Sequence, residues 1–307
     1  MTAARVELRE VVKRFGRIEA VRGVSFDLGS GETVALVGHN GAGKTTLMKL
    51  MLGLIRPTSG RIEVLGENPA AGDFSARLEL GYLPENVSFN PSLTGRETLS
   101  FYARLKRQPR KAVAMLLERV GLADAADRHL GTYSKGMRQR LGLAQALLAE
   151  PRVLLLDEPT TGLDPALRRS FYDTIEELRA GGATVLISSH ALTELEERAG
   201  RVIIMNRGLK VADGSLEELR RMAHLPTRIR LKIADGALGE MPEWLGPFGA
   251  WRRINGHVVE VDTSPENKIG LLHRATDAAA PVEDLEIVPA TLDDLYAHFL
   301  RSQEPAP

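Results

Sequence analysis

One loop in this sequence combines glycines with a lysine and a threonine at a fixed spacing. It runs from Gly38 to Thr45, with the sequence GHNGAGKT, between an apolar run that predicts a buried strand, Thr33–Val37, and a helical pattern, Thr46–Leu54. Glycines let backbone N–H groups approach phosphate oxygens, and the start of a helix adds partial positive charge. The pattern G-x-x-x-x-G-K-[ST] in this setting therefore predicts a phosphate-binding loop for a nucleotide.

The side chains of this loop have separate expected tasks. We expect Lys44 to reach the outer phosphates and the Thr45 hydroxyl to ligate Mg²⁺. The expected nucleotide-binding residues are Gly38, His39, Asn40, Gly41, Ala42, Gly43, Lys44, Thr45 and Thr46. A glycine-rich turn formed by coincidence is the alternative, but it does not account for the strand before it and the helix after it.

Two carboxylates follow a second apolar strand, Val153–Leu156. Asp157 is placed to hold the Mg²⁺ ion through its water shell, and Glu158 to polarise a water for in-line attack on the γ-phosphate. Taken alone, this segment is more simply interpreted as a charged exit from a strand. With a phosphate-binding loop on the same chain, the two carboxylates indicate nucleotide hydrolysis.

The composition of the chain excludes several kinds of partner and of chemical site. Among 307 residues, 40 Lys and Arg balance 40 Asp and Glu, so no overall charge recruits nucleic acid or an anionic membrane. The absence of cysteine excludes disulfides, thiolate metal sites and cysteine nucleophiles. We expect no signal peptide at the N-terminus and no membrane-spanning segment, because apolar runs such as 47–55 fall short of the roughly 18 residues required.

Strands and helices alternate as far as about Arg220, which predicts a mostly parallel α/β sheet of the P-loop NTPase type. Its expected strands are Thr33–Val37, Val153–Leu156, Thr184–Ser188 and Val202–Met205. Val6–Val11 and Val24–Leu28 alternate apolar and polar residues, and therefore predict an antiparallel side sheet. Residues 86–150 predict a helical insert, with helices that start at Thr94, Pro109 and Ser134.

A domain boundary is expected after Met222, where Pro226 interrupts a helical pattern. This gives a nucleotide-binding domain over residues 1–222, an accessory α+β domain over 225–302 and a disordered tail over 303–307. The elements expected in the second domain are Arg228–Ala234, Ala237–Leu245, Trp251–Ile254, His257–Val261, Glu266–Ala278, Leu285–Val288 and Thr291–Leu300. Asn255-Gly256 predicts a two-residue hairpin turn, and the order β-α-β-β-α-β resembles a small ferredoxin-like fold.

A third motif, Tyr133–Arg140 (YSKGMRQR), lies between the loop and the carboxylate strand. In isolation it predicts only a capped, basic start of a helix. Together the motifs resemble the nucleotide-binding subunits of ABC transporters over residues 5 to about 220, with Lys135 and Met137 departing from the usual L-S-G-G-Q signature. The resemblance implies that Ser134 and Gly136 face the γ-phosphate of ATP bound to the other subunit of a dimer.

The resemblance also assigns roles to single residues. Phe15 would stack on adenine, although packing of a strand end into the core is its alternative. Asp164 would lie in the loop that crosses the dimer interface, and His190 would touch the γ-phosphate. Glu85 stands where glutamine is usual and would hydrogen-bond the water on Mg²⁺, with its charge changing the local electrostatics.

Some segments resemble one branch of the family more closely. Glu85, the signature SKGM and the closing segment Ala290–Tyr296 resemble ATPases of ABC-2-type exporters. Four segments look like the ATPase subunit of the transporter that matures the copper centres of nitrous-oxide reductase: Gly38–Asn40, Leu83–Val87, Thr94–Leu99 and Thr132–Leu147. The seven histidines show no close pair at ligand spacing and cysteine is absent, so we do not expect this chain itself to bind copper.

The resemblance thus implies an ATPase that uses ATP and Mg²⁺, forms a homodimer and drives integral membrane permease subunits. It would be a peripheral protein on the cytoplasmic face of the inner membrane, and a periplasmic partner would act through the permease. The insert near Leu93–Lys106 would receive the permease. The alternatives are an ABC-2-type exporter of drugs, lipids or polysaccharides, and a soluble ABC ATPase outside transport, which usually carries two motors or a long coiled coil.

Overall fold

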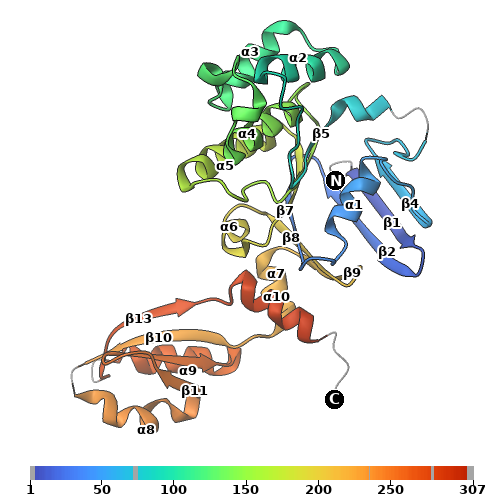
Figure 1. Ribbon diagram of the computed structural model, residues 1–307. Coiled ribbons are helices and arrows are strands. Elements are labelled where there is room, and N and C mark those ends of the chain that lie inside the picture. Colours follow the sequence, from blue (N-terminus) through green and yellow to red (C-terminus); the bar gives the residue numbers. More distant parts are fainter. Residues whose placement is uncertain (1–3, 72–74, 235, 278–279, 303–307) are drawn as a thin grey trace. The chain divides into compact units, whose positions relative to one another are not determined.

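The computed structural model describes residues 4–71, 75–234, 236–277 and 280–302 (Figure 1). Contacts within the chain divide it into two compact units, Met1–Ser215 and Leu216–Pro307. The expected tail at 303–307 and the expected helix end at Ala278 lie outside the described residues. Within the described residues, no helix combines the length and the apolar character that a bilayer span requires.

The first unit is organised around a sheet of mostly parallel strands. Its strand order is β5-β6-β7-β3-β8-β9, with neighbours from β5 to β8 parallel and β9 antiparallel to β8. The strands are β3 (Thr33–Val37), β5 (Leu80–Leu83), β6 (Val153–Asp157), β7 (Thr184–Ser188), β8 (Arg201–Asn206) and β9 (Leu209–Gly214). Every residue of β3, β6 and β7 is buried, as their continuous apolar runs predict. The parallel core sheet is therefore confirmed.

A smaller antiparallel sheet accompanies it, with the order β2-β1-β4. Its strands are β1 (Ala4–Phe15), β2 (Ile18–Gly29) and β4 (Ser59–Val64). Helix α1 (Lys44–Met51) contributes Leu47 and Met48 to a core that also holds Leu8 from β1 and Val34 from β3. This shared core fixes the loop before α1 between the two sheets.

The helical insert forms three packed helices (Figure 1). They are α2 (Gly95–Leu105), α3 (Arg110–Arg119) and α4 (Lys135–Ala146), followed after β6 by α5 (Pro165–Ala180) and after β7 by α6 (Leu192–Glu196). Thr94 forms a capping box with Glu97 at the start of α2, and Ser134 caps α4. Short 3₁₀ turns occur at Ser75–Glu79, Ala123–Ala125, Leu130–Thr132, Ala237–Glu240 and Gly246–Phe248.

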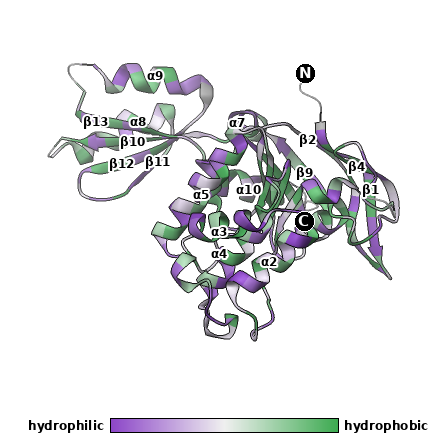
Figure 2. Cartoon of the chain, turned by 90° about the horizontal axis from the view of Figure 1, so that it is seen from above, coloured by the Kyte–Doolittle hydropathy of each residue, from purple (hydrophilic) through white to green (hydrophobic). Residues whose placement is uncertain are grey.

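The second unit contains a four-stranded antiparallel sheet with the order β11-β12-β10-β13. Its elements are α7 (Leu216–Ala223), β10 (Thr227–Ile233), α8 (Met241–Leu245), β11 (Gly249–Arg253), β12 (Val258–Thr263), α9 (Pro265–Ala275), β13 (Val282–Val288) and α10 (Leu292–Arg301). Both helices and strands carry hydrophilic and hydrophobic stretches (Figure 2). Along β10 the buried Ile229 and Leu231 alternate with Arg230, which gives the unit a core of its own.

Helix α7 belongs to the second unit. It packs on α10, and Arg220 Nε donates a hydrogen bond to the carbonyl oxygen of Ala290 at 2.8 Å. Leu219 and Ala223 are its buried residues. The boundary in the structure therefore precedes Leu216, whereas the sequence-based boundary after Met222 leaves nearly all of this helix with the first unit.

The turn between β11 and β12 is longer than predicted. A two-residue Asn-Gly turn requires positive φ at both residues, but neither Asn255 nor Gly256 has one. Four residues, 254–257, connect the strands, and Asn255 Oδ1 accepts a hydrogen bond from the backbone N–H of His257 at 2.9 Å. The hairpin is present, but the predicted type of turn is wrong because the asparagine side chain closes a different loop.

Candidate functional site

The loop between β3 and α1 curls around its own lysine. Gly41 and Gly43 have φ angles of 85° and 104°, and a Cβ atom at Gly43 would lie 2.5 Å from the carbonyl oxygen of Ala20. Lys44 is 7% exposed, and its Nζ donates hydrogen bonds to the carbonyl oxygens of Gly38 and, at 3.4 Å, His39. The ammonium group is therefore held inside the loop, where phosphate oxygens could take the place of these carbonyls.

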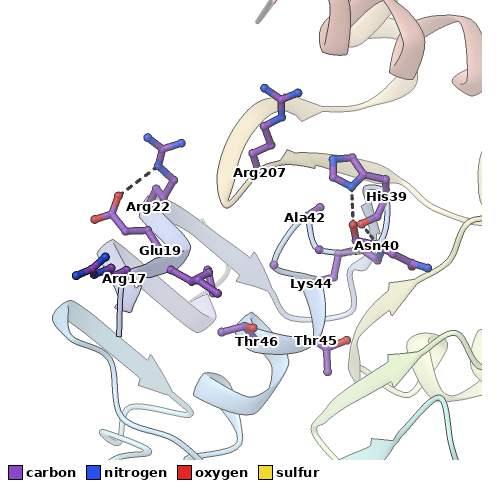
Figure 3. Close-up of a pocket in the computed structure, with 14 residues that line it drawn as sticks. Arg17, Glu19, Arg22, His39, Asn40, Ala42, Lys44, Thr45, Thr46 and Arg207 are labelled. Atoms are coloured by element: carbon purple, nitrogen blue, oxygen red, sulfur yellow. Dashed lines mark hydrogen bonds and ion pairs between the residues drawn. The ribbon is translucent and has the colours of Figure 1, made fainter. Parts of the chain in front are cut away.

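A cavity of about 680 Å³ opens beside this loop (Figure 3). Its lining consists of residues 39–46 of the loop and α1, residues 17–20 and Arg22 of the first hairpin, and Arg207 from the turn after β8. Glu19 is the one acidic residue among the described lining residues, and it pairs with Arg22 at 3.5 Å. The excess of arginine and lysine suits an anionic ligand.

Beside the loop, a buried carboxylate meets two hydroxyl groups. Thr45 Oγ1 donates to Asp157 Oδ2 at 2.7 Å, and Ser188 Oγ donates to Oδ1 at 2.5 Å, while Asp157 is 2% exposed. Burial and the Asp157 charge raise the pKa of Tyr82 on the neighbouring strand β5 to about 12. A carboxylate and a hydroxyl oxygen are the hard donors that Mg²⁺ prefers, so Thr45 and Asp157 fit this ion. When bound there, Mg²⁺ would neutralise phosphate charge.

The next residue, Glu158, points to a histidine from another strand end. Glu158 Oε2 accepts hydrogen bonds from His190 Nδ1 at 2.7 Å and from the His190 backbone N–H at 3.3 Å. The carboxylate side chain is 10% exposed, whereas the histidine ring is 73% exposed. The structure thus brings together two residues that the sequence singled out separately, and it leaves the imidazole open to a ligand.

The sequence of this chain is similar to those of known proteins. A family model described as "ABC transporter" matches residues 21–161. Over 294 residues the chain is 34% identical to the daunorubicin resistance ATP-binding protein DrrA3 of Streptomyces coeruleorubidus, covering 94% of this chain and 93% of that protein. The chain belongs to the ABC transporter ATP-binding proteins. It is an ATPase of this family, whose members bind ATP together with Mg²⁺.

Two other proteins are similar to this ABC ATPase, one over nearly the whole chain and one over about 70% of it. The Nod factor export ATP-binding protein I of Rhizobium sp. (strain N33) is 32% identical over 300 residues, covering 96% of this chain and 97% of that protein. A solved structure described as an ATP-binding subunit of an ABC transporter superposes with a TM-score of 0.67 at 31% identity, covering 71% of this chain and 92% of that chain. Homology to exporter ATPases thus extends beyond the first unit.

Ser134 and Asp164, which the sequence places at a dimer interface, both lie at the starts of helices. Ser134 Oγ accepts a hydrogen bond from the backbone N–H of Met137 at 3.2 Å and caps α4. Asp164 Oδ1 accepts one from Leu167 N–H at 2.9 Å and caps α5. A Cβ atom at Gly136 would meet only the Leu163 side chain, at 3.8 Å, within the described residues. These contacts give Ser134 and Asp164 structural roles within one chain.

Two expected residues do not line the cavity beside the loop, although Phe15 pairs with Ile18, which does. Phe15 is 49% exposed, which disagrees with packing into the core, and it is absent from the described lining of the cavity. Lys13 Nζ lies 4.9 Å from the centre of its ring. Glu85 is exposed after β5, and no described contact joins it to Thr45 or Asp157. Their expected roles at adenine and at Mg²⁺ therefore remain predictions.

His39 and Asn40 are both exposed at the start of the loop. His39 Nε2 lies 3.0 Å from Asn206 Oδ1 at the end of β8, and its Nδ1 lies 2.7 Å from the Asn40 carbonyl oxygen. Thr46, at the first turn of α1, lines the cavity. The distinctive histidine thus connects the loop to the neighbouring strand.

Sequence reasoning missed several residues of this region. Gln139 is 4% exposed, and its Nε2 donates to the carbonyl oxygen of Pro159 at 3.1 Å, which joins α4 to the segment after Glu158. Arg207 lines the cavity from the turn between β8 and β9. Gln139 belongs to the motif Tyr133–Arg140, but nothing in that motif marks it as a buried contact, and Arg207 belongs to no motif. Only the fold therefore identifies the positions of these two side chains.

Proposed function

We propose that this chain is the ATP-hydrolysing subunit of an ABC-2-type transporter, and that two copies close around two ATP molecules to move membrane permease subunits. The observation that carries the proposal is the Glu158–His190 pair, which lies one residue beyond the Thr45–Asp157 contact at the same end of the parallel sheet. The similarity to ATPases of daunorubicin resistance and Nod factor export favours this branch of the family.

In this proposal each residue of the site has one task. Lys44 binds the outer phosphates, and Thr45 and Asp157 hold Mg²⁺. Glu158 accepts the proton of the attacking water, and His190 contacts the γ-phosphate while its ring hydrogen-bonds the Glu158 carboxylate. The N-terminus of α4 in the second copy, with Ser134 and Gly136, directs its N–H groups at the γ-phosphate. In the same assembly, Asp164 lies at the dimer interface, Phe15 contacts adenine, and Glu85 contacts the water on Mg²⁺.

The test of this site uses two variants. Glu158→Gln keeps the shape of the side chain but removes the proton acceptor, so it should abolish hydrolysis and trap an ATP-bound dimer in size-exclusion chromatography with Mg-ATP. Lys44→Ala should instead weaken nucleotide binding itself and give no dimer. A Glu158→Gln protein that hydrolyses ATP at the wild-type rate refutes the assignment.

The proposed cellular arrangement follows from the motor role. The chain acts as a peripheral subunit on the cytoplasmic face of the inner membrane, the insert around Leu93–Lys106 receives the permease, and nucleic acid plays no part. For the second unit we propose a ferredoxin-like fold, because its strand order β11-β12-β10-β13 and its helices between β10 and β11 and between β12 and β13 suit that topology. Co-purification with the permease from membranes tests the arrangement.

For the cargo pathway we propose copper-centre maturation of nitrous-oxide reductase, by resemblance to the ATPase subunit NosF. The sequences around His39 and along Thr132–Leu147 support this proposal. Deletion of the gene should leave the reductase exported and folded but deficient in copper, and Lys44→Ala should reproduce the defect. Full copper loading in the deletion strain would contradict it.

A second candidate is export of a drug, lipid or polysaccharide, and the relatives named for daunorubicin resistance and Nod factor export favour it. In that case the deletion strain should lose an efflux activity while its reductase stays fully loaded with copper. The same pair of measurements therefore separates the two candidates.

A further inference from the structure

We propose that Glu194 is a positioning residue for hydrolysis, which holds His190 against the Glu158 carboxylate by tying α6 to the turn after Glu158. The proposal rests on the proposed role of Glu158 as the acceptor of the water proton. Glu194 lies in the first turn of α6, four residues after His190. It is not expected to touch the nucleotide and acts through the histidine.

The Glu194 carboxylate accepts three hydrogen bonds from two other parts of the chain. Oε1 accepts from an Arg168 guanidinium N–H at 2.6 Å. Oε2 accepts from Thr160 Oγ1 at 3.2 Å and from the Tyr172 hydroxyl at 3.1 Å. Arg168 and Tyr172 belong to α5, whereas Thr160 lies in the turn after Glu158. One carboxylate therefore connects three segments.

These contacts hold the turn that carries Glu158 at two points. The backbone N–H of Thr161 donates to the Glu158 carbonyl oxygen at 3.3 Å, and that of Leu163 donates to the Thr160 carbonyl oxygen at 3.1 Å. Arg168 Nε donates to the Leu163 carbonyl oxygen at 3.0 Å. Glu194 thus holds the turn directly through Thr160 and indirectly through the arginine.

The two hydroxyl groups that donate to Glu194 are buried, which makes the loss of their acceptor costly. Thr160 and Tyr172 are each 5% exposed, and the Glu194 side chain is 22% exposed. Burial, and secondly the negative charge of Glu194, raise the pKa of the Tyr172 hydroxyl. Removal of the carboxylate would leave two buried hydroxyl groups without this acceptor, so the turn and α6 would have to rearrange.

The position of the His190 ring depends on this backbone. The ring is largely exposed, and Glu158 is its described hydrogen-bond partner. The chain runs from His190 directly into α6, where Leu192 and Leu195 are buried and Glu194 contacts Thr160, Arg168 and Tyr172. A shift of α6 would therefore lengthen the contact between His190 and Glu158, and it would leave the phosphate-binding loop unchanged.

The test compares steady-state hydrolysis by the full chain and its variants. Glu194→Ala should lower kcat at least tenfold while the KM for ATP stays within about twofold of wild type. Glu194→Gln should be intermediate, since its amide oxygen can still accept a hydroxyl hydrogen bond but loses the charge opposite Arg168. Glu197→Ala is the matched control, because Glu197 is exposed at the end of the same helix, and it should hydrolyse at the wild-type rate.

A double-mutant cycle distinguishes positioning from a general loss of structure. If Glu194 acts through the histidine, Glu194→Ala should cause no further loss of kcat in a His190→Ala protein. Additive losses, or an unchanged kcat in both Glu194 variants, would overturn the proposal. An active Glu158→Gln protein would refute the proposed function instead, so the two failures are distinguishable. If Glu194→Ala does not fold, the cycle is made with Glu194→Gln.

Discussion

Thr45 and Asp157 lie 112 positions apart in the chain, yet a 2.7 Å hydrogen bond joins their side chains. The strand order makes this contact possible, since β7 separates β3 from β6 and its last residue, Ser188, holds the other carboxylate oxygen. The two side chains that we propose to hold Mg²⁺ are therefore adjacent in the protein itself.

Asp157→Asn should raise the Mg²⁺ concentration required for half-maximal hydrolysis at least tenfold. The amide keeps a neutral oxygen but loses the charge that attracts a divalent cation. Titration of Mg²⁺ at saturating ATP measures the effect, with Asp173→Asn as an exposed control on α5. An unchanged Mg²⁺ requirement would show that Asp157 is not a donor to the ion.

The glycines of the phosphate-binding loop should differ in their tolerance of alanine. Gly43→Ala should weaken ATP binding more than tenfold and lower the free energy of unfolding by about 2 kcal/mol, because its Cβ atom would lie 2.5 Å from the Ala20 carbonyl oxygen. Gly41→Ala, with nothing within 4 Å of its Cβ atom, should cost only about 1 kcal/mol for the positive φ. Equal losses would contradict the role of the Ala20 contact.

Two substitutions of Ser134 should distinguish its role as the helix cap of α4 from a role in binding the nucleotide. Ser134→Asp keeps a good cap for α4 and should preserve thermal stability, whereas Ser134→Ala should lower stability by about 1 kcal/mol. If Ser134 of one copy faces the γ-phosphate of the other, the added negative charge should prevent the ATP-dependent dimer. Dimer formation by Ser134→Asp in a Glu158→Gln background would contradict this prediction.

Lys106 should make stability depend on pH in the alkaline range. Its Nζ donates to the carbonyl oxygens of Leu80 and Leu148, and burial lowers the pKa of its ammonium group to about 8. The unfolded chain therefore binds more protons between pH 8 and about pH 10.5, so stability rises with pH in this window.

Relative to Lys106→Met, the wild-type free energy of unfolding should increase by up to about 3 kcal/mol across that window. Urea denaturation followed by circular dichroism at several pH values measures the difference. Lys111→Met, at an exposed position on α3, is the control and should track the wild type. A constant gap between wild type and Lys106→Met would contradict the lowered pKa.

The boundary before Leu216 predicts the outcome of truncation. A fragment that ends at Ser215 should bind Mg-ATP with an affinity within about threefold of the full chain, because all described residues of the phosphate-binding loop and its cavity precede that point. A fragment that ends at Met222 keeps most of α7 without α10 and exposes Leu219, so it should be more prone to aggregate. Isothermal titration and light scattering compare the two, and a collapsed fragment 1–215 would show that the units share a core.

Fixed spacing made much of this site predictable. The phosphate-binding loop and the Asp157–Glu158 pair depend on contiguous residues next to buried strands, so one-dimensional patterns suffice to find them. The cap residues Thr94 and Ser134 are equally local. Strands β4 and β9 were not predicted, because they contain glycine and charged residues and owe their pairing to β1 and β8.

Contacts between distant side chains were beyond sequence reasoning. Glu194 lies 26 positions from Arg168 and 34 from Thr160, and no local pattern pairs them. The amphipathic character of α7 shows that one face is buried but does not reveal that α10 covers it, which is why the boundary was placed too late. At Asn255-Gly256 the local preference for a two-residue turn did not decide the structure. A four-residue connection, closed by the Asn255 side chain, joins the two strands instead.

The backbone of Glu158 has a φ of 49°, a left-handed conformation that costs a side chain with a Cβ atom about 1 kcal/mol. Glycine would relieve that cost, so if Glu158 is the proposed proton acceptor, the residue that is most stable at this position differs from the one needed for hydrolysis. A library of variants selected only for heat resistance should therefore enrich Glu158→Gly and drift toward inactive protein. Retention of Glu158 in a library selected for heat resistance alone would contradict this prediction.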